Sequence, residues 1–147
     1  MQQSSNKIKI KNILYVTTTI SGSAHYFSYV HYPTIWYYRL QKKIIHSFIN
    51  SPKLNFMTNF YPNELYTNPN HNIKVNHKHG ELLSSLQEKK YDLILTEAPA
   101  TTLLEILSTK SQVICFIPKK YIKLHSNALA LLKKRAFVLE EENDYLN

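Results

Sequence analysis

The strongest constraint on the fold is the alternation of short apolar runs with amphipathic stretches. Strands are predicted by apolar, β-prone runs, which lie at 13–16, 54–60, 73–75, 91–95, 112–117 and 137–139. Helices are predicted by the spacing of apolar residues between these runs, at 35–49, 81–88, 102–107 and 121–135. Strands that alternate with helices imply βαβ crossovers. We therefore expect an α/β fold: a Rossmann-like three-layer domain with a mostly parallel sheet of about six strands.

The chain has 147 residues, a length that suits one domain. We expect residues 1–11 to be a flexible lead-in and residues 12–147 to form a single domain. The polar, basic N-terminus lacks the apolar stretch of a signal peptide, and no run approaches the roughly 20 apolar residues of a spanning helix. These features predict a cytoplasmic protein with at most peripheral membrane contact.

Composition excludes several kinds of site. The chain contains two glycines, Gly22 and Gly80, which is too few for a glycine-rich dinucleotide loop or a P-loop. Its one cysteine, Cys115, excludes an internal disulfide framework, and its apolar neighbours predict a buried strand residue. The sequence has no Cys or Cys/His pairs at metal-ligand spacing. The net charge of +8 suggests an anionic partner, such as a nucleotide phosphate, nucleic acid or acidic lipid, or else a solvated basic surface.

In the predicted helix at 35–49, the apolar residues recur at a spacing of four and should face the core. Four polar residues should lie mostly on the other side of the helix; they are Arg39, Gln41, Lys42 and Lys43.

The segment YDLILTEAPATTLLEIL, residues 91–107, combines a buried strand, a turn and a helix that starts with threonines. A helix start exposes unpaired N–H groups and the positive end of the helix dipole, which suits phosphate. Thr101 and Thr102 add hydroxyl donors, and Glu105 could accept hydrogen bonds from ribose hydroxyls. A structural alternative is a capping box, in which Thr102 and Glu105 satisfy the donors at the helix end.

This segment resembles the donor-binding segment of GT-B glycosyltransferases, notably those of surface or capsular polysaccharide biosynthesis. The family pattern is matched at Asp92, Thr101, Thr102, Leu104 and Glu105, whereas Ile106 stands where the family usually has alanine. The resemblance implies that the two threonines lie near the donor phosphates and that Glu105 lies near the ribose.

Three further stretches support the same resemblance. Residues 13–45 are similar to the family's first strand, loop and aromatic-rich helix, with Ser21, Gly22 and Ser23 at the small-residue tip that closes over the donor phosphates. Residues 56–63 match in part, but Asn59 stands where the family has a phosphate-neutralising lysine. Residues 112–139 match the last strands and helix. Of the seven histidines, His25 in the first loop is the best candidate for ligand contact.

The resemblance implies the donor-binding domain of a glycosyltransferase that needs no metal and no cofactor beyond its nucleotide-sugar substrate. GT-B enzymes act between two such domains, so a second chain could supply the acceptor domain, and the lone chain should be inactive. Nucleic acid is not expected as a partner under this interpretation. The alternative is a non-enzymatic basic α/β module that binds nucleic acid or a protein. The candidate binding residues are Ser21, Gly22, Ser23, His25, Thr101, Thr102 and Glu105.

Overall fold

The computed structural model describes residues 9–18, 34–60, 76–78, 82–97 and 101–141. Its strands are β1 (Asn12–Val16), β2 (Asn55–Asn59), β3 (Asn76–Lys78), β4 (Leu93–Thr96), β5 (Gln112–Phe116) and β6 (Phe137–Leu139). Its helices are α1 (Thr34–Ile49), α2 (Leu82–Glu88), α3 (Thr101–Ser108) and α4 (Ser126–Arg135).

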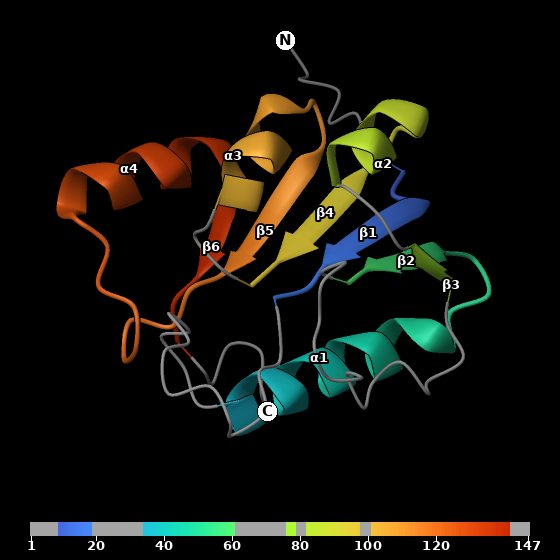
Figure 1. Ribbon diagram of the computed structural model, residues 1–147, viewed down its shortest axis with the longest axis horizontal. Helices are drawn as coiled ribbons and strands as arrows, with labels where there is room; N and C mark the ends of the chain where they lie inside the picture. Colours follow the sequence, from blue (N-terminus) through green and yellow to red (C-terminus); the bar gives the residue numbers. More distant parts are fainter. Residues whose placement is uncertain (1–8, 19–33, 61–75, 79–81, 98–100, 142–147) are drawn as a thin grey trace, which may run out of the picture.

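The strands form one sheet in the order β3-β2-β1-β4-β5-β6, and every neighbouring pair is parallel. Helix α1 lies on one face of this sheet, and α2, α3 and α4 lie on the other (Figure 1). The predicted Rossmann-like three-layer α/β fold is confirmed. The strand order matches the doubly wound arrangement in which the chain reverses its direction of growth between β1 and β4.

The pairing register determines which side chains share a face. Ile13 lies beside Phe56 on β2 and Leu93 on β4, so these three side chains point to the same side of the sheet. Phe56 stacks on Phe48 of α1 with 5.0 Å between the ring centroids. This contact identifies the side covered by α1. Leu14, the next residue along β1, must then point toward the layer of α2, α3 and α4.

The core lies on both sides of the central strands, as a parallel sheet with helices on both faces requires. Its members are apolar residues from the strands and from the inner faces of the helices. Those with no more than 1% of their surface exposed are Ile13, Leu14, Tyr15, Leu40, Ile45, Phe60, Ile94, Ile106 and Cys115. Cys115 is therefore the buried strand residue that its neighbours predict.

Helix α1 packs more broadly on the sheet than its apolar spacing predicts. Trp36, Leu40 and Ile44 are buried as expected, and Arg39 and Lys42 are exposed. The assignment of Gln41 to the outer side is wrong, because Gln41 has none of its surface exposed. The physical reason is that its amide finds polar partners in the interior, which are described below.

Two elements begin three or more residues from their predicted positions. The strand predicted at 73–75 falls outside the described residues, and β3 occupies the next three positions. The helix predicted from residue 121 begins at Ser126 instead. The cause is a cap at His125, whose Nδ1 accepts a hydrogen bond from the backbone N–H of Asn127 at 3.3 Å.

Asp92 ties the starts of β1 and β4 together. Its Oδ2 accepts hydrogen bonds from the backbone N–H groups of Lys11 at 2.9 Å and Asn12 at 2.8 Å. These hydrogen bonds hold the pKa of Asp92 below its usual value. Asp92, at the amino end of β4, therefore has a structural role, and Lys11, at the end of the predicted flexible lead-in, is held in place.

Candidate functional site

The candidate site lies where the chain leaves β1 and β4, at the carboxyl ends of the two strands. These strands are neighbours in the sheet, but the helices that follow them, α1 and α3, lie on opposite faces (Figure 1). In open α/β sheets, ligands bind outside the carboxyl ends of the strands at this kind of switch point. The residues immediately after β1 and β4 are therefore the candidates for ligand contact.

The residue that follows β4 is Glu97, which is completely buried. Its Oε2 accepts a hydrogen bond from the backbone N–H of Thr18, just after β1, at 3.1 Å. The same oxygen accepts a second hydrogen bond from Nε2 of Gln41 on α1, also at 3.1 Å. Gln41 in turn donates to the carbonyl oxygen of Thr18 at 3.0 Å. Glu97 thus connects β4, α1 and the chain leaving β1.

The second carboxyl oxygen of Glu97, Oε1, is buried and has no hydrogen-bond partner among the described residues. Burial raises the pKa of Glu97 well above its usual value, and the hydrogen bond from Thr18 opposes this effect only in part. The raised pKa shifts the carboxyl group toward its protonated form, in which Oε2 can still accept both N–H bonds.

Tyr37 adds a third contact to this corner. Its side chain hydrogen-bonds the side chain of Thr18, and burial raises the pKa of the Tyr37 hydroxyl. Thr18 is therefore held by β4 through Glu97 and by α1 through Gln41 and Tyr37. Residues 19–33, which contain the predicted loop residues Ser21, Gly22, Ser23 and His25, follow directly and lie outside the described residues.

A second buried polar group joins the carboxyl ends of β1 and β2. The backbone N–H and the hydroxyl of Thr17 both donate to the carbonyl oxygen of Asn59, at 3.1 and 3.2 Å. The side-chain amide of Asn59 donates to Oγ of Ser85 on α2 at 3.4 Å. Asn59, the residue in the family's lysine position, has only 4% of its surface exposed and serves as an internal connector.

The three remaining candidate residues lie on α3, which follows β4. Thr101 is exposed at the start of the helix, and Thr102 is half-buried one residue further on. The helix begins at Thr101, one residue before the position that the capping-box alternative gives to the N-cap.

Glu105 lies one turn into α3 and is half-buried. It lines a cavity of about 620 Å³ between α2 and α3, together with Leu86, Lys90 and Lys110. This cavity extends toward the amino ends of β4 and β5, because Asp92 and Gln112 also line it. The structure therefore brings the two threonines to the segment after β4, whereas Glu105 faces α2.

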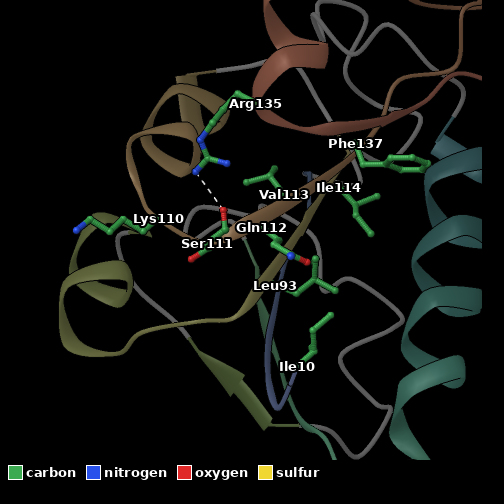
Figure 2. Close-up of a pocket in the computed structure, with 9 residues that line it drawn as sticks. All are labelled: Ile10, Leu93, Lys110, Ser111, Gln112, Val113, Ile114, Arg135 and Phe137. Carbon is green, nitrogen blue, oxygen red and sulfur yellow. Dashed lines mark hydrogen bonds between the residues drawn. The ribbon is translucent and has the colours of Figure 1, made fainter. Parts of the chain in front are cut away.

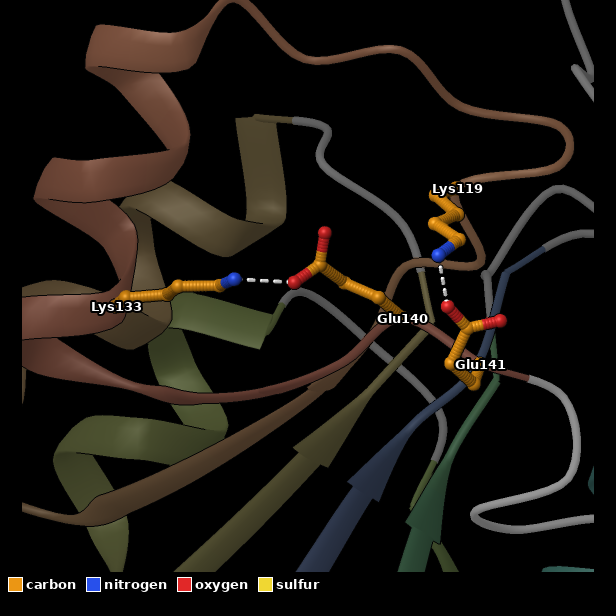
Figure 3. Close-up of polar contacts among 4 residues, drawn as sticks. All are labelled: Lys119, Lys133, Glu140 and Glu141. Atoms are coloured by element: carbon orange, nitrogen blue, oxygen red, sulfur yellow. Dashed lines mark ion pairs between the residues drawn. The ribbon is translucent and has the colours of Figure 1, made fainter.

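Opposite charges are paired at the carboxyl end of β6. Lys119, which follows β5, pairs with Glu141, and Lys133 on α4 pairs with Glu140 (Figure 3). The contact with Glu141 raises the pKa of Lys119. In this arrangement the charge of Lys119 is already balanced by a carboxylate.

Two other kinds of chemistry find no support in the described part of the chain. Burial raises the pKa of the Cys115 thiol to about 12, so the thiolate that nucleophilic chemistry requires is not formed at neutral pH. Among the described residues, no group of three His, Cys, Asp or Glu side chains could hold a metal ion. Within the same ranges, no helix has the length and apolar character needed to cross a membrane.

The fold and the buried carboxyl group at the switch point define this chain as a Rossmann-like α/β domain. Comparison with known proteins adds no relative, because no family model, no curated protein and no solved structure matches the sequence.

Proposed function

We propose that this chain binds a nucleotide sugar at the carboxyl ends of β1 and β4, as the donor-binding domain of a glycosyltransferase of surface polysaccharide biosynthesis. In such a reaction, an acceptor hydroxyl replaces the nucleoside diphosphate at the anomeric carbon of the sugar. The domain holds the diphosphate and leaves the anomeric carbon open to the acceptor. A second domain or chain would bind the acceptor, since GT-B enzymes act between two Rossmann-like halves.

The observation that carries the proposal is the inaccessible carboxyl group of Glu97 at the switch point. Leaving a buried polar atom such as Oε1 without a partner costs about 1–3 kcal/mol. Buried groups with strongly perturbed pKa values cluster at functional sites. Because the side chain is fully enclosed, we assign Glu97 the role of fixing Thr18, where the segment with Ser21, Gly22 and Ser23 begins. Direct contact with the donor is assigned to that segment and to the start of α3.

The start of α3 supports the same location. It follows β4 directly, and a helix N-terminus offers backbone N–H groups to a phosphate. The exposed hydroxyl of Thr101 lies at this end of the helix. The missing lysine at Asn59 removes one cation from the site, so we expect weak binding of the nucleoside diphosphate.

Calorimetry with nucleoside diphosphates and a panel of nucleotide sugars tests the proposal. We expect weak binding of at least one nucleoside diphosphate and no glycosyl transfer by the chain alone. The exposed start of α3 provides the variant: Thr101→Val should weaken that binding about fivefold, since a hydrogen bond contributes about 1 kcal/mol. Glu105→Gln, in the cavity beside α2, is the matched control and should leave the binding unchanged. Absence of binding by every nucleotide in the panel would refute the proposal.

The alternative, a non-enzymatic basic module that binds nucleic acid or a protein, is favoured by a different observation. Seven of the sixteen Lys and Arg residues that the structure describes lie at the amino ends of the strands, at the edge of the sheet opposite Glu97. A binding surface there is independent of a nucleotide site.

A further inference from the structure

The amino ends of the strands carry a row of cations. The segments that precede β1, β2, β4, β5 and β6 are residues 9–11, 50–54, 89–92, 109–111 and 135–136. They contain seven cations, which are Lys9, Lys11, Lys53, Lys89, Lys90, Lys110 and Arg135, and one carboxylate, Asp92. We call this set the amino edge.

Geometry places these charges close together. Neighbouring strands lie about 4.8 Å apart, so the five strands from β2 to β6 span roughly 19 Å. Lys9, Lys53, Lys90 and Lys110 are exposed, and no described carboxylate forms an ion pair with them. Asp92 already accepts two backbone hydrogen bonds beside Lys11. Glu105 lines the same cavity as Lys90 and Lys110, so the seven cations face two carboxylates, Asp92 and Glu105. The amino edge therefore presents an excess of positive charge to the solvent, unlike the paired lysines at the carboxyl end of β6.

Apolar surface lies directly beside these cations. A cavity of about 470 Å³ opens at the amino ends of β4, β5 and β6, with walls formed by Ile10, Leu93, Val113, Ile114 and Phe137 (Figure 2). Lys110 and Arg135 line the same cavity. Phe137 has 66% of its surface exposed. Arg135 donates to the carbonyl oxygens of Thr109 and Ser111, which holds the guanidinium at this position.

We propose that the amino edge is a docking surface for the anionic leaflet of a membrane. Lysines in a row along one edge attract lipid phosphates, and each cation near an anionic surface strengthens partitioning roughly fivefold. The apolar walls behind Lys110 and Arg135 suit an amphiphile with an anionic headgroup. A nucleic acid is polar along its whole backbone, and single-stranded binding uses several stacking aromatics, whereas Phe137 is the one aromatic among the residues of this cavity.

The test is co-sedimentation of the full chain with vesicles of phosphatidylcholine, with and without phosphatidylserine. We expect binding only to the vesicles that contain phosphatidylserine, and loss of that binding at high salt, where screening shortens the reach of charges. The double variant Lys90→Glu, Lys110→Glu should bind at least about 25-fold more weakly, because two cations are lost and two anions are gained. Phe137→Ala should weaken binding several-fold without changing its salt dependence.

A matched control separates a local effect from net charge. The double variant Lys42→Glu, Lys123→Glu makes the same change in charge at exposed positions on α1 and after β5, away from the amino edge. It should retain most of the binding, and melting temperatures should show that both variants fold. Equal losses in the two double variants, or no vesicle binding by the wild type, would overturn the proposal. Binding of a single-stranded oligonucleotide in place of vesicles would do the same and identify nucleic acid as the partner.

Discussion

Replacing Glu97 with glutamine tests the central feature of the candidate site. The glutamine side chain has the same shape, and its carbonyl oxygen can still accept the hydrogen bonds from Thr18 and Gln41. The amide cannot ionise, so any dependence of stability on the titration of residue 97 disappears. The change thus isolates the protonation state of one buried group.

The sign and size of the effect follow from linkage. Burial raises the folded-state pKa of Glu97 above its ordinary value of 4.5, so the folded chain holds a proton that the unfolded chain releases. This contribution to stability is fully present below pH 4.5 and is lost as the pH rises through the folded-state pKa. In that window, the wild type should lose about 1.4 kcal/mol per pH unit relative to Glu97→Gln. For a chain of this length, the loss corresponds to about 4 °C in Tm per pH unit.

Thermal denaturation of both proteins across pH values above 4.5 measures this difference. The buried amide N–H₂ of the variant adds a constant offset of about 1–3 kcal/mol, because its donors face the place where Oε1 has no described partner. The informative quantity is therefore the slope with pH and not the absolute Tm. The matched control is Glu105→Gln, which makes the same substitution at a half-buried position on α3. Parallel profiles for the wild type and Glu97→Gln would refute the neutral-carboxyl argument.

Three further predictions concern the fold. Ile94→Ala, in the centre of the sheet, should lower the free energy of unfolding by about 2–5 kcal/mol in urea titrations, because it removes a fully buried side chain. Asp92→Asn should lower the Tm at neutral pH. The low pKa of Asp92 gives the wild type a stabilisation that is present above pH 3.8 and lost as the pH falls through the folded-state value, so the two melting curves should converge in acid. Cys115 should resist a maleimide reagent in the folded chain and react fully in denaturant, as mass spectrometry can show.

The periodicity of the sequence was sufficient to predict the layers of this fold. The residues from Leu93 to Leu95 and from Val113 to Ile117 form uninterrupted apolar runs, as is typical of strands with helices on both faces of the sheet. The recurrence of Trp36, Leu40 and Ile44 likewise predicted α1. The start of α4 was harder to predict, because the apolar pattern continues upstream of Ser126 and the cap depends on one ring nitrogen of His125.

The buried polar residues could not be recognised from the pattern. Gln41 occupies a helical position beside charged neighbours, and only the tertiary contact with Glu97 explains its burial. Glu97 follows four buried residues, Leu93 to Thr96, and a carboxyl group directly after such a strand is the signal that could have identified it. The same carboxyl group, two residues before Pro99, also fits an ordinary turn, so this signal alone did not place it in the interior.

Net charge is therefore a poor guide to the position of a nucleotide site in this molecule. A diphosphate at the carboxyl ends of β1 and β4 would find Glu97 enclosed, with a raised pKa, and Asn59 buried and uncharged, while the charge of Lys119 is balanced by Glu141. The hydrogen bonds available to it from the described residues come from the start of α3. Seven of the described Lys and Arg residues lie at the opposite edge of the sheet. A membrane bound there would leave the carboxyl edge facing away from it. We therefore expect tight binding of a nucleotide sugar only when a second domain or chain brings cations to the carboxyl edge.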